Sequence, residues 1–178
     1  MKMNRMKSRY MMMMGLIVGV LIVGCSTLTT AEREAKKAEK AAWVTKCLDN
    51  KHFVIDVDMM NTRRMGSKML TSDWSLEVKG DTLVSYLPYV GVAHEPIFGE
   101  VKGLNFTAPF MSYEDRGFSK GVRTIRFRVS SGEDMLEYTL EVTENGYASI
   151  DVISRAREGI SFSGQMDENV KPEKEKNK

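Results

Sequence analysis

Histidine and cysteine are scarce in this chain of 178 residues, which contains two of each. The two histidines, His52 and His94, are far apart, and the HExxH spacing of a zinc protease is absent. On a β-strand that rises about 3.3 Å per residue, His52 and Asp56 would lie about 13 Å apart, too far to hold one ion together. The sequence therefore predicts neither a metal site nor a cofactor.

The chain also lacks an apolar run that is long enough to cross a membrane as a helix. The uncharged stretch from Met11 to Val23 is shorter than the roughly twenty residues that a membrane-spanning helix needs. Four basic residues precede this stretch, and Gly24-Cys25 follows it. A basic n-region, an apolar h-region and a small residue before the cut are typical of a secretory signal.

The four residues that end at Cys25 resemble the bacterial lipobox, with an aliphatic residue three positions before the cysteine and a glycine directly before it. In such signals the thiol is acylated and the preceding segment is removed. Two or three acyl chains, at about 0.8 kcal/mol per buried methylene, hold a protein durably on a membrane. We therefore expect residues 1–24 to be a lipoprotein signal peptide, with the membrane as a partner. The alternatives are a plain transmembrane anchor or a secretory signal with an incidental cysteine.

The second cysteine, Cys47, has no partner for a disulfide within the chain if Cys25 is acylated. No activating base lies near Cys47 in the sequence. We expect a small buried side chain rather than a nucleophile.

An excess of basic charge is also missing. The whole chain has 26 Lys and Arg residues against 24 Asp and Glu residues, a net charge of +2. Without residues 1–24, which contain four basic side chains, the remaining 154 residues have 22 basic and 24 acidic side chains. No basic stripe remains, so we expect no nucleic-acid partner. A chain of this length suits one domain.

What the chain does contain, after a short polar tether, is one helical segment. Residues 31–48 are rich in Ala, Glu and Lys and contain neither Gly nor Pro. Thr30 is the expected N-cap, and the end around Trp43 and Leu48 is expected to dock on a core. The tether and the helix together occupy residues 25–50.

From residue 51 onward the hydrophobic period changes to two, which is typical of half-buried strands. The expected strands lie around residues 53–57, 74–78, 83–87, 101–108, 125–129, 136–142, 148–152 and 159–164, with longer excursions at 59–72, 90–100 and 110–120. This pattern predicts a mainly β domain over residues 51–166, an antiparallel meander of about eight strands preceded by one N-terminal α-helix. It would close as a curved sheet, a small barrel or a sandwich. The charged tail, residues 167–178, is expected to be disordered.

Two short loops predict the register of their strands. A two-residue turn at Gly80-Asp81, with glycine first as a type II′ turn prefers, sets Val78 opposite Leu83 on one face. A second two-residue loop at residues 132–133 likewise aligns the apolar residues on either side of it. Pattern and turn agree in both hairpins.

A third hairpin needs a three-residue loop. A two-residue Asn145-Gly146 turn would set Val142 opposite Ser149 and spoil the apolar face. A loop over residues 144–146, with Gly146 in the left-handed position of a G1 bulge, sets Val142 opposite Ala148 instead. The sequence therefore predicts the bulge.

The most irregular stretch of the β-domain is dense in aromatic and apolar residues, which indicates a ligand or partner surface or else a core plug over one end of the barrel. The candidate surface residues are Tyr86, Pro88, Tyr89, Val90, Gly91, His94 and Phe98.

The same stretch offers one catalytic hypothesis. His94 lies beside Glu95, and Asp115 on a later excursion could complete a general acid–base site of a hydrolase. No serine, threonine or cysteine lies in a recognisable nucleophile motif. Catalysis at His94 with Glu95 or Asp115 is therefore the alternative to a surface turn.

Four stretches resemble a family catalogued as domain of unknown function 4251 (DUF4251), small lipoproteins of Bacteroides-like gut bacteria. They are Trp74–Asp81, Ser85–Gly91, Glu144–Gly146 and Arg157–Gly164. The Tyr-Leu-Pro-Tyr-x-Gly element within the second stretch is the specific one. The family usually continues with Arg-Ala-Tyr where this chain has Val-Ala-His at 92–94, so a role of that Arg or Tyr does not carry over. The resemblance implies a small lipoprotein and its location on a bacterial membrane, but it implies no activity.

Together these observations predict a membrane-anchored, non-enzymatic domain that binds an unknown protein or a small ligand. An envelope structural protein or an inhibitor is a further alternative. Related bacteria often mark surface lipoproteins with acidic residues just after the cysteine, whereas here Glu32 is the first acid. We therefore expect an outer-membrane lipoprotein that faces the periplasm.

Overall fold

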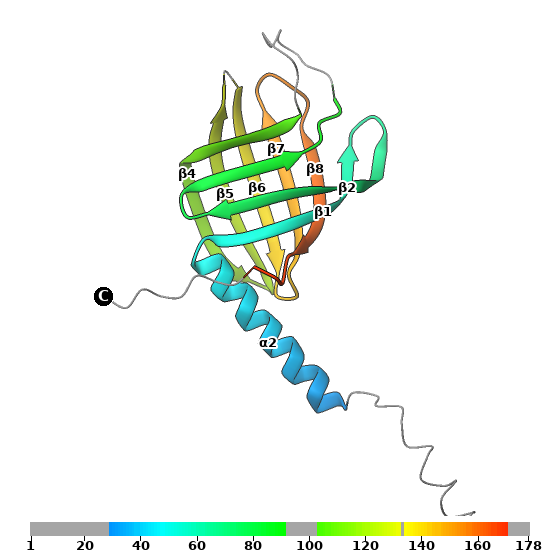
Figure 1. Cartoon of the computed structure of the whole chain (residues 1–178), viewed down its shortest axis with the longest axis vertical. Helices are drawn as coiled ribbons and strands as arrows, with labels where there is room; N and C mark the ends of the chain where they lie inside the picture. Colours follow the sequence, from blue (N-terminus) through cyan, green and yellow to red (C-terminus); the bar gives the residue numbers. More distant parts are fainter. Residues whose placement is uncertain (1–28, 92–102, 133, 171–178) are drawn as a thin grey trace, which may run out of the picture. The chain divides into compact units, whose positions relative to one another are not determined.

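The computed structural model describes residues 29–91, 103–132 and 134–170, in which one helix precedes eight antiparallel strands (Figure 1). The elements are α2 (Thr30–Asp49), β1 (His52–Thr62), β2 (Gly66–Lys79), β3 (Thr82–Leu87), β4 (Leu104–Ser119), β5 (Val122–Ser131), β6 (Asp134–Thr143), β7 (Tyr147–Ser154) and β8 (Ile160–Met166). Each strand pairs with the next, and β8 pairs with β1. The predicted meander is therefore a closed barrel, the second of the three predicted closures.

The N-cap of α2 is Thr29, so the prediction of a cap at Thr30 is wrong. The Thr29 amide donates to Glu32 Oε2 at 2.8 Å, and the Glu32 amide donates to Thr29 Oγ1 at 3.3 Å. This reciprocal pair is a capping box, which needs Glu or Gln three residues after the cap. A cap at Thr30 would place Arg33 there, and an arginine cannot accept the returning bond.

The C-terminal part of α2 belongs to the barrel core, as the sequence predicted. Val44, Cys47 and Leu48 are buried in one cluster with the barrel side chains, and Trp43 packs against it. Cys47 is thus the buried thiol that was expected. Among the described residues, no helix is long and apolar enough to span a membrane.

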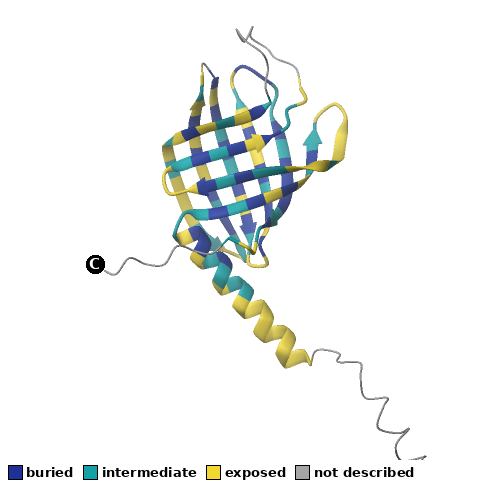
Figure 2. Cartoon of the chain, viewed as in Figure 1, coloured by how far each residue is buried: buried dark blue, intermediate teal, exposed yellow. Residues whose placement is uncertain are grey.

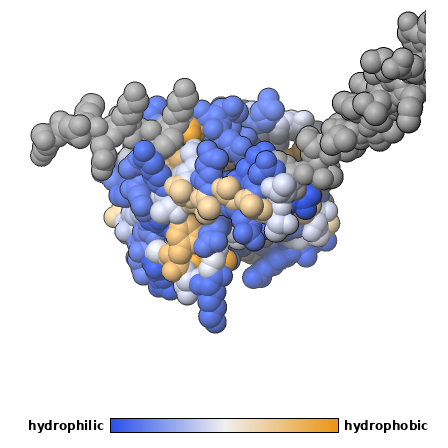
Figure 3. All heavy atoms as spheres, turned by 90° about the horizontal axis from the view of Figure 1, so that it is seen from below, coloured by the Kyte–Doolittle hydropathy of each residue, from blue (hydrophilic) through white to orange (hydrophobic). Residues whose placement is uncertain are grey.

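Alternate residues of each regular strand fill the barrel, which appears as alternating bands in Figure 2. In β5, for example, Ile125, Phe127 and Val129 are buried, whereas Arg126 and Arg128 are exposed. The described surface seen in Figure 3 is correspondingly mostly hydrophilic, with hydrophobic residues gathered in a narrow strip.

The three predicted hairpin registers are confirmed. Val78 pairs with Leu83 across the first turn, and the second hairpin pairs as its loop requires, although Glu133 lies outside the described residues. In the third hairpin Val142 pairs with Ala148, and Gly146 has the left-handed φ of 81° that the G1 bulge demands.

Two predicted excursions are strands instead, and these predictions are wrong. Residues 59–70, called the arm below, continue β1 and β2 as a paired hairpin, and residues 110–119 continue β4. Both stretches are largely exposed, and register shifts lie at the start of the arm and within residues 110–119, so bulges and solvent exposure interrupt the period-two signal. The third excursion and the first residues of the strand expected at 101–108 lie mainly outside the described residues.

The closure of the barrel requires a glycine in β8. A Cβ added to Gly164 would lie 2.8 Å from the carbonyl carbon of Asp56 and 2.9 Å from Val57 Cα, both in the backbone of β1. Only a residue without a side chain lets the first and last strands approach so closely.

Candidate functional site

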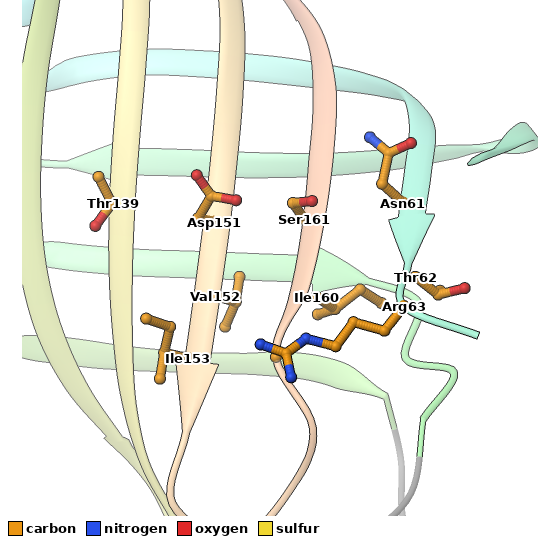
Figure 4. Close-up of a pocket in the computed structure, with 10 residues that line it drawn as sticks. Asn61, Thr62, Arg63, Thr139, Asp151, Val152, Ile153, Ile160 and Ser161 are labelled. Atoms are coloured by element: carbon orange, nitrogen blue, oxygen red, sulfur yellow. The ribbon is translucent and has the colours of Figure 1, made fainter. Parts of the chain in front are cut away.

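A groove lies between the arm and the outer face of the barrel. One hollow of about 490 Å³ is lined by the arm and by the outer faces of β6, β7 and β8 (Figure 4). A second hollow of about 200 Å³ shares Thr62, Arg63 and Gly159 with the first and extends to Val90 and Gly91. We call the two hollows together the groove. Val90 and Gly91, two of the predicted surface residues, form one end of it.

Four polar side chains form a row along the groove, called the polar row below. The row consists of Thr139 on β6, Asp151 on β7, Ser161 on β8 and Asn61 on β1. Each member pairs in register with the next across the strands, and Figure 4 shows their side chains following one another across four ribbons. Neighbouring strands lie about 4.8 Å apart, so the row is about 14 Å long.

The arm adds a cation to the groove. Arg63 is exposed, and no hydrogen bond or ion pair involves it among the described residues. Its side chain extends from the arm over the groove in Figure 4. Arg64, by contrast, lies 3.7 Å from the Glu158 carboxylate. On the barrel side, Ile153 is 60% exposed and offers an apolar patch.

The chemistry of the groove is that of hydrogen bonding. A hydroxyl nucleophile needs a base within hydrogen-bond reach, and no such bond involves Ser161 or Thr139 in the described part of the chain. The described ranges also contain no group of three His, Cys, Asp or Glu residues arranged to hold a metal ion. The side chains of the polar row can donate and accept hydrogen bonds, Arg63 can pair with a negative charge, and Asp151 can pair with a positive one.

Beside the groove, Tyr89 is held by the connection between β7 and β8. Its hydroxyl donates to the Glu158 carbonyl at 2.9 Å, and the Arg157 guanidinium lies 4.9 Å from the ring centroid. Burial raises the pKa of Tyr89, against the opposing effect of Arg157. These contacts hold the backbone of Val90 and Gly91 at the end of the groove.

Arg157 is itself part of a buried polar cluster. Its Nε donates to Asp134 Oδ2 at 3.0 Å, with side chains only 8% and 4% exposed. The Ser154 hydroxyl donates to the same carboxylate at 2.8 Å, and Arg157 Nη1 donates to the Gly103 carbonyl at 3.4 Å. Such a pair is tolerated only because its hydrogen bonds are satisfied.

A family profile decides the identity of the domain. The profile of DUF4251, a domain of unknown function, matches residues 35–166, which is most of the chain. The chain belongs to the DUF4251 family. The family that the four stretches resembled is thereby confirmed.

A solved member of the DUF4251 family has a similar fold. The crystal structure of a DUF4251 family protein from Bacteroides eggerthii DSM 20697, at 1.95 Å resolution, matches with a TM-score of 0.55 and 14% sequence identity. The match covers 74% of this chain and 89% of that chain. At this identity the likeness shows the fold alone. No protein of curated function matches the chain.

The barrel brings two of the DUF4251 stretches together. Tyr89 belongs to Ser85–Gly91 and Arg157 to Arg157–Gly164, and the cation and the ring lie face to face. Tyr86, in the stretch Ser85–Gly91, is 48% exposed and stacks on Trp74 with ring centroids 4.7 Å apart. Pro88 of the same stretch is half-buried.

The remaining predicted residues are placed in part. His94, Glu95 and Phe98 lie outside the described residues, so the hydrolase hypothesis stays a prediction. Its other candidate, Asp115, accepts hydrogen bonds from Arg123 Nε at 3.0 Å and from the Gly117 amide at 2.9 Å. Burial raises the pKa of Asp115, but these bonds and the charge of Arg123 outweigh it and hold the pKa below its ordinary value. The Asp115 carboxylate is thus held by Arg123 and the Gly117 amide.

Sequence reasoning missed most of the groove. Thr139 and Asp151 could be placed opposite each other from the third hairpin, because that loop determines their register. Ser161 and Asn61 could not be joined to them, since the pairing of β8 with β1 leaves no local signal. The arm was itself predicted as an irregular excursion.

Proposed function

We propose that this DUF4251 protein is a lipoprotein anchored through Cys25, on the periplasmic face of the outer membrane, and that its barrel binds a component of the cell envelope without transforming it. The observation that carries the binding role is the groove, where paired strands present the polar row opposite Arg63, a cation with no partner in the described part of the chain. Side chains on paired strands are preorganised, which lowers the entropic cost of binding. The lipobox at Cys25 supports the proposed membrane location.

Photocrosslinking in intact cells tests the binding role. A photoreactive amino acid replaces Ile153 within the groove, and the matched control replaces Tyr147, which is exposed on the same strand outside it. Intact-mass spectrometry of the purified lipoprotein reports an adduct of any chemical class. We expect an adduct at position 153 but not at 147. Equal labelling at both positions, or at neither, would sink the proposal.

Metabolic labelling tests the anchor independently. A clickable palmitate analogue should label the wild-type chain, and Cys25→Ser should abolish the label. Cys47→Ser is the matched control and should retain the label. A wild-type chain that takes up no label, or a Cys25→Ser chain that is labelled as strongly as wild type, would refute acylation at Cys25.

A further inference from the structure

We propose that the groove binds a linear acidic saccharide, laid across strands β6, β7, β8 and β1 with a carboxylate of the sugar on Arg63. This inference rests on the proposed binding function and names its ligand class. Three features carry it, namely the spacing and chemistry of the polar row, the cation that Arg63 adds to the groove, and the pairing of the strands beneath the row.

The polar row suits a chain of sugar rings. Hydroxyl and amide side chains both donate and accept hydrogen bonds, as sugar hydroxyls do, and the Asp151 carboxylate accepts them. Consecutive members of the row lie on neighbouring strands and are therefore about 4.8 Å apart. This distance is close to the length of one pyranose ring. The row of about 14 Å therefore matches about three consecutive rings. Ile153, 60% exposed beside the row, can pack against the C–H face of a ring.

The cation on the arm favours an acid group on the ligand. Glu158 is paired with Arg64, whereas Arg63 on the arm and Asp151 on the barrel have no partner among the described residues. An arginine fork binds a carboxylate through two parallel hydrogen bonds, and it loses less solvation than an ammonium does. A carboxylate on the ligand would thus pair with Arg63, which no described residue neutralises.

The strand pairing argues against an extended peptide. Peptides that bind sheets add along a free edge and use backbone hydrogen bonds. Here β7 pairs with β6 and β8, and β8 pairs with β7 and, from Ser161 onward, with β1. Beneath the polar row the strands therefore offer no free edge, and β1 and β8 separate only beyond Asn61 and Ser161. The polar row also crosses the strands rather than following one of them, so recognition along the row must come from side chains.

A retention assay tests the ligand class. The full-length lipoprotein in detergent micelles is passed over beads that carry linear acidic polysaccharides (polygalacturonate, alginate, hyaluronan), neutral ones (galactan, laminarin, pullulan) or poly-glutamate. We expect retention by at least one acidic polysaccharide and weaker retention by neutral ones. Arg63→Gln should weaken the affinity for that polysaccharide about tenfold or more, as the loss of a charged hydrogen bond does. Lys68→Gln removes the same charge from the arm outside the groove, and it should have little effect.

A second pair of variants tests the polar row. Asp151→Ala should weaken retention, whereas Ser149→Ala, on the same strand outside the groove, should not. Retention by poly-glutamate as strong as by any saccharide, equal losses in Arg63→Gln and Lys68→Gln, or no retention by any polysaccharide would each overturn the inference. If position 153 still gives an adduct in cells while no saccharide is retained, the binding function survives and only the ligand class falls.

Discussion

Removal of the Arg157 side chain should strongly destabilise the barrel. Arg157→Met leaves the Asp134 carboxylate, 4% exposed, without its cation and with the Ser154 hydroxyl as its remaining side-chain donor. Breaking a buried ion pair from one side costs about 3–5 kcal/mol. The lost contact with the Tyr89 ring adds about 0.5–2 kcal/mol. We therefore expect the free energy of unfolding to fall by about 4 kcal/mol or more, a large share of the 5–15 kcal/mol typical of a domain.

Urea denaturation followed by circular dichroism measures this loss. Arg155→Met changes the exposed neighbour and should stay within about 0.5 kcal/mol of wild type. The double variant Arg157→Met/Asp134→Leu removes both buried charges and should recover most of the stability, because the remaining carboxylate is what makes the single variant costly. A single-variant loss below about 1 kcal/mol, or a double variant no better than the single one, would refute the reasoning.

Three further predictions follow from the barrel and its ends. Gly164→Ala should lower the free energy of unfolding by about 1–3 kcal/mol or more, because the new methyl meets the β1 backbone, and an unchanged urea midpoint would contradict that close approach. Burial raises the pKa of Cys47 to about 11, so Ellman's reagent at about pH 8 should react with this thiol only after unfolding, and the folded state should lose stability as the pH rises from about 9 towards 11. Since the pKa of Asp115 is lowered in the folded state, its contribution is present above about pH 4 and is lost as the pH falls below that value. Asp115→Asn should therefore flatten the loss of stability below about pH 4, and a slope as steep as that of wild type would show that Asp115 is not responsible.

The regular part of the fold follows from local patterns in the sequence. Alternation identifies the faces of β5, β6 and β7, and the requirement that Val142 face Ala148 is enough to distinguish a three-residue loop from a two-residue one. The arm and the second half of β4 escape this reasoning because register shifts interrupt their alternation and only a few of their residues, such as Met60 and Tyr113, pack on the core. The sequence of a largely exposed strand looks like that of a loop, because the strand is held in place by its hydrogen-bonded partner and not by a buried apolar face.

The candidate site depends on contacts that sequence periodicity does not contain. Arg157 and Asp134 are buried charges, and a periodic pattern assigns such residues to the surface until a partner is known. The four members of the polar row are ordinary outward-facing residues when taken strand by strand. They become a row only when the barrel closes.

The pairing of β1 with β8 also has a kinetic consequence. All other neighbours in the barrel are joined by chain that runs directly from one strand to the next, but closure must bring together the first and last strands of the domain. Such a contact pays the largest loop-closure entropy and is expected late in folding. Until residues 160–166 arrive, β1 and β7 both present unpaired edges, which invite pairing between chains. A chain that is cut short before β8 is therefore expected to aggregate rather than to form a smaller barrel.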